Sequence, residues 1–239
     1  MSDVNFGTNQ DTNTWPYGFS IRKGIVPNMS GIDKFGYLPT AGSSFKTVWD
    51  GDNVYTYPSN AVAMTVTSAS GATDENVEIT IQGLDTNYDP LTETVTLNAS
   101  GVATTTGLFL RVFRAFVSNG QELDGDTTIA NTGITYAKIT AEMQQTLMAV
   151  YTIPNGYRGY LVAGNMSVEK DQPVVAKLMV RRQGGVLRAS GIITSFGVPF
   201  QRVWQLPPVL DEKTDIEIRA KAGATTSIAA GFEIVLEKK

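Results

Sequence analysis

Acidic side chains at alternate positions are the first groups in this chain that could do chemistry. Asp85 to Asp89 and Glu122 to Asp126 have the one-apart spacing of a calcium-binding loop. In the first segment, Pro90 stands where such a loop needs glycine and Thr96 where it needs a bidentate carboxylate. The second segment has no Glu at the twelfth position. We therefore expect polar turns at both places and no metal site.

The chain contains no His and no Cys. This removes the commonest general base, the thiol nucleophile and the usual ligands of zinc, copper, haem and iron–sulfur clusters. Carboxylates such as Asp50, Asp52, Asp74 and Glu75 could serve a glycosidase, but nothing in the sequence sets two of them at a defined separation. No S-x-x-K or G-x-S-x-G element occurs. We expect no catalytic residues, no cofactor and no enzymatic activity.

Aromatic and basic side chains suit contacts with another protein. Interface energy concentrates in aromatic anchors, and arginines on alternating strands can face the carboxylates of a partner. The predicted assembly residues are the aromatic side chains Trp15, Phe19, Phe35 and Tyr37 and the arginines Arg158, Arg181, Arg182 and Arg188.

Tryptophan at the edge of a sandwich offers an alternative, because such rings also stack on sugars. Trp49 and Trp204 are the predicted contacts for a host-surface glycan. Burial in a core or a subunit contact is the other reading of the same residues.

The elements that must position these residues are short strands. Residues 1–44 have several Gly, Asn and Pro, isolated aromatics and no sustained period, which predicts an extended docking arm. Removal of residues 1–40 is then expected to leave a folded body that no longer joins its assembly. Residues 45–145 alternate in segments such as 77–82 and 91–98, which predicts a first β-sandwich.

Residues 146–239 contain about eight further strand signals separated by turns, as in 159–169, 174–182 and 228–236. This spacing predicts a second, jelly-roll-like sandwich. The expected fold is therefore all-β, with two antiparallel β-sandwich domains and an extended N-terminal arm.

Charge is divided along the chain. Residues 1–145 carry 7 Lys and Arg against 15 Asp and Glu, and residues 146–239 carry 12 against 8. The net charge of −4 disfavours nucleic acid as the main partner. The opening residues show no secretory signal, and no apolar stretch is long enough for a membrane span, so we expect synthesis in the cytoplasm. The split in charge is either chance or a sign that copies meet acidic face to basic face.

Five segments of the chain resemble recurrent segments of virion structural proteins of tailed bacteriophages, particularly those of marine bacteria. They are Ile32–Gly51 (IDKFGYLPTAGSSFKTVWDG), Gly83–Leu97 (GLDTNYDPLTETVTL), Thr146–Leu161 (TLMAVYTIPNGYRGYL), Arg182–Val186 (RQGGV) and Pro208–Ile216 (PVLDEKTDI).

The resemblance implies a non-enzymatic virion component of the head surface, the neck or the tail, present in many symmetric copies. Decoration of the head would favour trimers or pentamers over capsid axes. We expect an accessory protein that decorates or stabilises the capsid through its arm. Its expected partners are further copies of itself, with a trimer favoured, and other virion proteins such as the major capsid protein. The alternatives are a neck or tail protein and a host-glycan adhesin.

Overall fold

The structure of the 239-residue chain is a computed structural model, and it describes residues 17–239. The predicted all-β class is confirmed: strands make up 54% of the residues that the structure describes, and one short α-helix, α1 (Tyr17–Arg22), accompanies them. Within the described residues, no helix has the length and apolar character needed to cross a bilayer.

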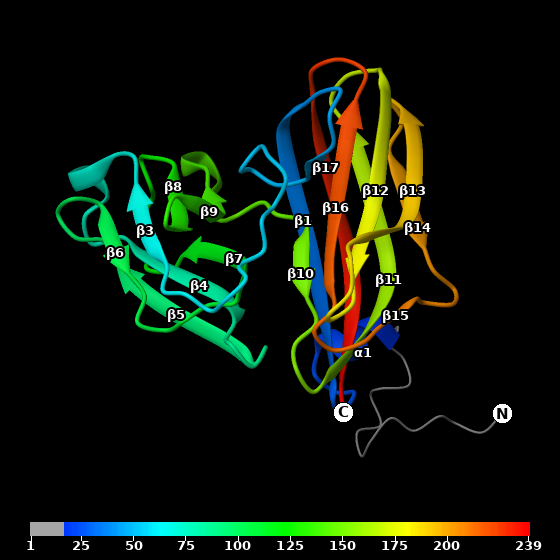
Figure 1. Ribbon diagram of the computed structural model, residues 1–239, viewed down its shortest axis with the longest axis horizontal. Helices are drawn as coiled ribbons and strands as arrows, with labels where there is room; N and C mark the ends of the chain where they lie inside the picture. Colours follow the sequence, from blue (N-terminus) through cyan, green and yellow to red (C-terminus); the bar gives the residue numbers. More distant parts are fainter. Residues whose placement is uncertain (1–16) are drawn as a thin grey trace.

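Two antiparallel sheets form the larger body, seen at the right of Figure 1. The first sheet has the order β1 (Met29–Ala41), β17 (Thr226–Lys238), β11 (Tyr157–Val168) and β14 (Phe200–Val203), with β15 (Val209–Leu210) also on β11. The second sheet has the order β10 (Val150–Thr152), β16 (Asp215–Ala222), β12 (Pro173–Arg181) and β13 (Arg188–Phe196), with β2 (Lys46–Thr47) also on β16.

The pairing of these strands is nested. The first strand of this body pairs with the last (β1 with β17), and β10 pairs with the strand before the last, β16. Further inward, β11 pairs with β14, and β12 pairs with β13, the next strand in the sequence. A long hairpin rolled into two four-stranded sheets has this order, which is that of a jelly roll. Between the sheets lies one apolar core, with Leu38, Ile216 and Phe232 at its centre.

β2 and β10 are two halves of one strand position. Thr47 pairs with Arg219, and Val150 pairs with Glu217 on the same edge of β16. Between them, Ile218 accepts a hydrogen bond from the Val48 amide (2.8 Å) and donates its own to the Ala149 carbonyl (3.1 Å). The 101 residues from 49 to 149 therefore leave and re-enter the jelly roll at a single point of one strand. We call residues 49–149 the insert.

The insert has two small sheets around its own core, which includes Trp49, Ile79, Phe109 and Ile139. One sheet has the order β6 (Val102–Thr104), β3 (Thr65–Ser68), β8 (Thr127–Asn131) and β9 (Ile134–Ile139), and the other has β5 (Pro90–Thr96), β4 (Glu78–Leu84) and β7 (Arg111–Val117). Two short 3-10 helices, η2 (Gly71–Asp74) and η3 (Ala141–Met143), complete it.

The predicted arm over residues 1–44 is wrong where the structure describes it. β1 pairs with β17 along most of its length, and α1 packs on β1. Ile32, Lys34 and Leu38 point into the sandwich, but a lysine and two glycines in this run concealed the alternation. The expected boundary at residue 45 also shifts, because β1 and β2 belong to the sheets of the C-terminal sandwich. Deletion of residues 1–40 would remove a core strand rather than an arm.

Candidate functional site

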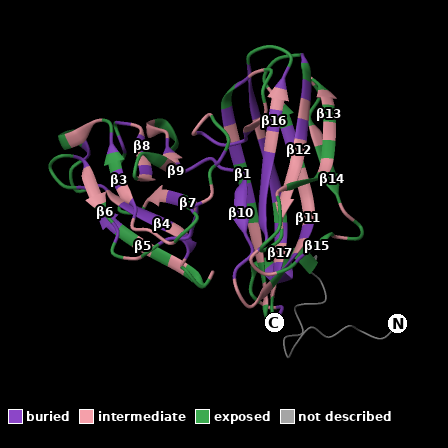
Figure 2. Cartoon of the chain, in the orientation of Figure 1, coloured by how far each residue is buried: buried purple, intermediate pink, exposed green. Residues whose placement is uncertain are grey.

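The edge of the jelly roll at β13 and β14 exposes an unusual amount of apolar surface. Each of the two strands has a neighbour on one side only, and the connection at residues 197–199 crosses from β13 in one sheet to β14 in the other. Figure 2 shows this edge in exposed and intermediate colours, whereas β16 and β17 in the middle of the two sheets are largely buried. Seven of the fourteen exposed large apolar side chains of the described chain lie here: Val186, Ile192, Phe196, Val198, Val203, Leu206 and Val209. We call these seven residues the edge surface.

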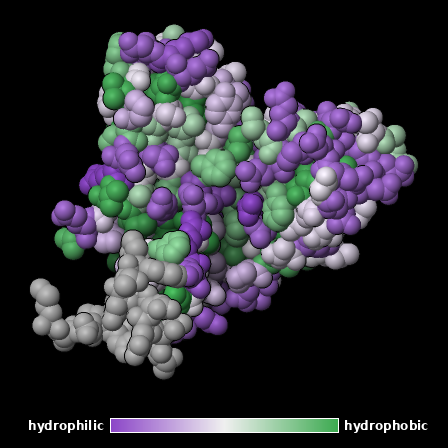
Figure 3. Space-filling model, turned by 180° about the vertical axis from the view of Figure 1, so that it is seen from behind, coloured by the Kyte–Doolittle hydropathy of each residue, from purple (hydrophilic) through white to green (hydrophobic). Residues whose placement is uncertain are grey.

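The same region is basic. Residues 172–210 contain five Lys and Arg and no Asp or Glu. Arg182, Arg188 and Arg202 are exposed there, and the first two line a groove of about 680 Å³ together with Val186 and Val209. In Figure 3, which views the molecule from behind, hydrophobic and hydrophilic residues are interspersed on the jelly roll. Unpaired apolar edge strands are normally covered or disrupted in soluble proteins, so this surface is a candidate contact with another protein.

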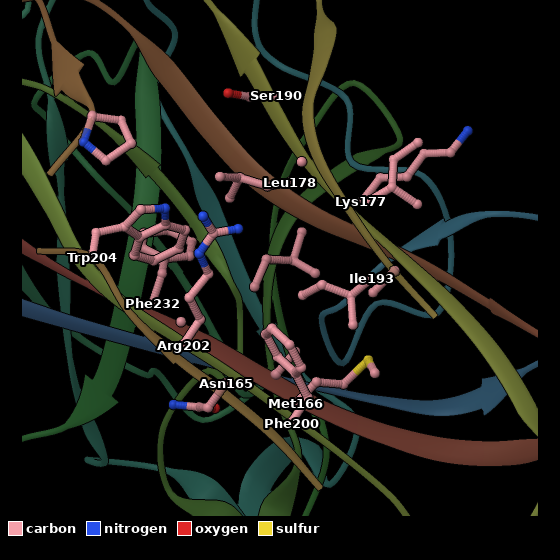
Figure 4. Close-up of a pocket in the computed structure, with 18 residues that line it drawn as sticks. Asn165, Met166, Lys177, Leu178, Ser190, Ile193, Phe200, Arg202, Trp204 and Phe232 are labelled. Atoms are coloured by element: carbon pink, nitrogen blue, oxygen red, sulfur yellow. The ribbon is translucent and has the colours of Figure 1, made fainter. Parts of the chain in front are cut away.

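A cavity of about 140 Å³ opens between the two sheets behind this edge. Trp204 and Arg202 lie side by side at it, with the guanidinium carbon 5.0 Å from the ring centroid (Figure 4). The Trp204 ring packs over Gly164, where a Cβ atom would come within 3.3 Å of it. The remaining walls are mainly apolar, with Met166, Leu178, Ile193, Phe200 and Phe232 among them.

The predicted aromatic anchors do not form one site. Phe19 on α1 and Phe35 on β1 are exposed, with 52% and 48% of their surface accessible. Tyr37 is half-buried, and its backbone amide donates to the Leu147 carbonyl at 3.3 Å. Trp15 lies outside the described residues.

The predicted arginines are also divided. Arg182 and Arg188 lie together at the edge surface, whereas Arg158 is exposed on β11 of the other sheet. Arg181 is half-buried, and its Nε donates to Asp215 at 2.8 Å, which directs the guanidinium toward the interior. Arg181 is therefore a structural residue.

Trp49 is wrong as a glycan contact, because its side chain is fully buried in the core of the insert. Its indole Nε1 donates to the Asn53 carbonyl at 2.9 Å, and its ring meets Tyr55 edge-on at 5.3 Å. Trp204, at the cavity, is half-buried.

A buried ion pair ties the insert to the jelly roll. Arg111 of β7 donates from Nε and Nη2 to the two carboxylate oxygens of Asp215 on β16, at 2.8 and 3.2 Å. Burial lowers the pKa of Arg111, but the hydrogen bond and charge of Asp215 outweigh it and hold that pKa above its usual value. The guanidinium also lies between the rings of Tyr57 and Tyr88, at 5.2 and 5.3 Å. Every face of Arg111 is thus occupied from within the chain.

Two further ionisable groups lie buried where the insert joins. The ammonium of Lys34 on β1 donates to the carbonyl of Phe113 in the insert. Burial, and then the charge of Arg114, lower its pKa to about 7. Asp50 accepts a hydrogen bond from the Leu147 amide at 3.2 Å, and burial raises the pKa of its carboxyl to about 7.

The segment from Asp85 to Asp89 is a turn, as expected. Asp85 Oδ1 accepts from the amides of Asn87 and Asp89, at 2.8 and 2.9 Å. In residues 17–239, no set of three or more acidic side chains is placed to hold a metal ion.

Sequence reasoning missed the edge surface and the Arg111–Asp215 pair. The edge surface had a detectable signal, namely a 39-residue stretch without a carboxylate and with apolar residues on both faces of its strands. The ion pair had none, because its two residues lie 104 positions apart and meet only through the tertiary fold.

No family model matches the chain, and no curated protein matches it. Among solved structures, it is weakly similar to the structure of infectious bursal disease virus Gx strain, with 10% identity, a TM-score of 0.25, and coverage of 96% of this chain and 78% of that one. The crystal structure of the infectious bursal disease virus VP2 subviral particle gives 10% identity and a TM-score of 0.18, with 88% and 72% covered. TM-scores this low carry no inference about the function of this chain.

Proposed function

We propose that the protein is a non-enzymatic structural component of a tailed-phage virion, an accessory protein that works in several copies by decorating or stabilising the capsid surface. The observation that carries this proposal is the nested strand order of the C-terminal body. Jelly rolls of two four-stranded sheets are the fold of many viral capsid domains, and also of lectins and cupins. A fold alone does not define a function, so the proposal also rests on the surface of the molecule.

The surface supports assembly rather than isolation. The edge surface joins apolar side chains with exposed arginines, the combination found in protein interfaces. The insert lies to one side of the jelly roll, and its chain leaves and re-enters that body at one point (Figure 1). A body that packs against its neighbours and a second body that it presents outward suit a virion protein displayed in many copies.

Quantitative mass spectrometry of purified virions, with electron microscopy of the same particles, tests the proposal. We expect the chain in the particles at a stoichiometry that matches a symmetric position on the head. A stoichiometry that follows the tail tube would move it to the neck or tail. Absence from the particles, or turnover of a substrate by the purified protein, would contradict the structural role.

A docking function of the N-terminus now concerns a shorter segment than the sequence indicated. Deletion of residues 1–16 removes none of the described strands, so it separates docking from folding. If the segment docks the protein, the shortened chain stays folded and no longer joins the particle.

Trp204 keeps a second candidate function open. It lies with Asn165 and Arg202 at an open cavity, an arrangement that could bind a sugar of a host surface. Binding on a glycan array that is lost in Trp204→Ala but retained in Phe35→Ala would favour this adhesin role over decoration.

A further inference from the structure

The two most distinctive surfaces of the molecule lie at opposite ends. In Figure 1 the longest axis is horizontal; the insert occupies its left end, and β13 and β14 lie at its right end, beyond the core of the jelly roll. The insert of the same copy therefore lies too far away to cover the edge surface.

The two ends also carry opposite charge. The insert has 3 Lys and Arg against 12 Asp and Glu, a net charge of −9. The rest of the described chain has 16 against 9, a net charge of +7, and none of its carboxylates falls within residues 172–210. The split found in the sequence thus follows the boundary between the insert and the jelly roll.

In one part of the insert, several exposed carboxylates lie near the exposed side chain of Met143. Asp124 and Glu75 meet at Asp74, whose Oδ1 accepts from the Asp124 amide at 2.8 Å. Gln144 Oε1 accepts from the Leu123 amide at 2.9 Å, which brings Glu142 and the half-exposed Met143 beside Glu122. We call Glu75, Glu122, Asp124, Glu142 and Met143 the acidic tip.

Charge decides how two copies can meet. A two-fold contact of the edge surface with itself would bring Arg182, Arg188 and Arg202 against the same three arginines, which is repulsive. A head-to-tail contact instead places these arginines against carboxylates while the apolar side chains are covered. We propose that the edge surface of one copy binds the acidic tip of the insert of the next copy. Such a contact is heterologous, so it closes into a ring or continues as a row. This inference rests on the proposed function, which requires several copies.

A charge-swap experiment on the full-length chain tests the contact. Arg188→Glu/Arg202→Glu and Glu122→Lys/Asp124→Lys are each expected to weaken self-association by about tenfold or more, measured by sedimentation velocity over a range of protein and salt concentrations. An equal mixture of the two variants should associate again, because each then supplies the surface that the other lacks. All four side chains are exposed, so the variants should fold normally, as circular dichroism can verify.

Two controls match these variants. Arg22→Glu/Lys238→Glu makes the same change in charge on exposed residues of α1 and the end of β17, away from β14, and should associate as the wild type does. Phe196→Ser should weaken association and Phe35→Ser should not, although both rings are about half exposed.

The outcomes separate the two proposals. A wild-type chain that associates, with edge and tip variants that associate equally well, overturns the head-to-tail contact and leaves the structural role intact. If both variants lose self-association and their mixture does not regain it, the head-to-tail contact is also overturned, because the edge surface and the acidic tip then do not bind each other. A wild-type chain that remains monomeric at every concentration and is absent from virions overturns both.

Discussion

Asp215 holds more of this structure together than any other single carboxylate described here. It accepts from Arg111, from Arg181 and from the Thr152 hydroxyl, at 2.8, 2.8 and 2.6 Å, and it is buried. Arg111 comes from the insert and the other groups from the jelly roll. Removing the carboxylate charge would leave a buried guanidinium without its counter-ion.

We expect Asp215→Asn to lower the free energy of unfolding by about 3 kcal/mol, the cost of breaking a buried ion pair from one side. Urea denaturation measures this. Asp211→Asn is the matched control, because its carboxylate is exposed and lies 4.0 Å from Arg182; it should change stability by less than about 0.5 kcal/mol. Equal effects of the two variants would show that Asp215 is not the tie.

Asp50 should make stability depend on pH. Burial raises its pKa to about 7 in the folded state from an ordinary value of 3.8, so between these values the folded state holds a proton that the unfolded state has lost. Rising pH therefore favours unfolding across this window, by up to roughly 4 kcal/mol for this group. In Asp50→Asn, this pH-dependent contribution to the free energy of unfolding disappears.

Urea midpoints at a series of pH values check this prediction. The difference in stability between Asp50→Asn and the wild type should grow from pH 4 to pH 7 and then level off. Asp211→Asn should show no such growth. Lys34 acts in the next window: its lowered pKa means that the unfolded state binds more protons above pH 7, so its contribution to stability rises there.

Among the elements, β1 shows how closely the sheets and the insert approach each other. A Cβ atom on Gly36 would lie 2.1 Å from the Val48 carbonyl oxygen and 2.4 Å from the Ala149 amide, the two points where the chain leaves and re-enters the jelly roll. These are backbone atoms of a paired strand, so they cannot yield as a flexible side chain would.

Gly36→Ala should therefore destabilise the protein by about 3 kcal/mol or prevent folding. Gly42 is the control in the segment after β1, because nothing lies within 4 Å of a Cβ built there and its φ is not in the left-handed region. Gly42→Ala should be near neutral in thermal unfolding. A neutral Gly36→Ala would mean that the backbone is not packed this closely.

Strands with clear alternation were predictable from the sequence, and the elements with mixed signals were not. Residues 91–98 and 174–182 were expected as strands and form β5 and β12 within one or two residues. β1 was missed because Lys34 stands at an inward position, where its ammonium bonds to the Phe113 carbonyl. Strand order could not be predicted, since β1 and β17 lie about 200 residues apart. The same limit hid Asp215, whose partners are distant in sequence.

At the scale of the whole molecule, the insert is an interruption of one strand. If residues 49–149 are left out, successive residues of β16 pair with Lys46, Thr47, Val48, Val150 and Tyr151, and no position along β16 is left unpaired. In this joined strand, Val48 and Tyr151 would face the core of the jelly roll, and Thr47 and Val150 would face away from it, as the alternation of a β-strand requires.

A chain in which Val48 is joined directly to Val150 should fold to a stable jelly roll, with cooperative thermal unfolding and a β-type circular dichroism spectrum. The core of the jelly roll loses Ala149 and the contact of Phe113 but keeps its other members, and Asp215 keeps Arg181 as its counter-ion. Joining Val48 to Ala149 instead adds one residue and forces a bulge or a one-residue slip, so this variant should be markedly less stable. Equal stability of the two would contradict the continuous register.

The single point at which the chain leaves and re-enters the jelly roll also has a consequence for ancestry. Because the splice needs no spacer, gain or loss of the intervening segment by recombination would not disturb the host fold. A relative with another module at this position would align with the present chain in two blocks, one ending at Val48 and one beginning at Val150. Residues 49–149, which lie between the two blocks, would have no counterpart in that relative. An alignment of the jelly-roll residues alone, with Val48 joined to Val150, should therefore show higher similarity to such a relative than an alignment of the whole chain.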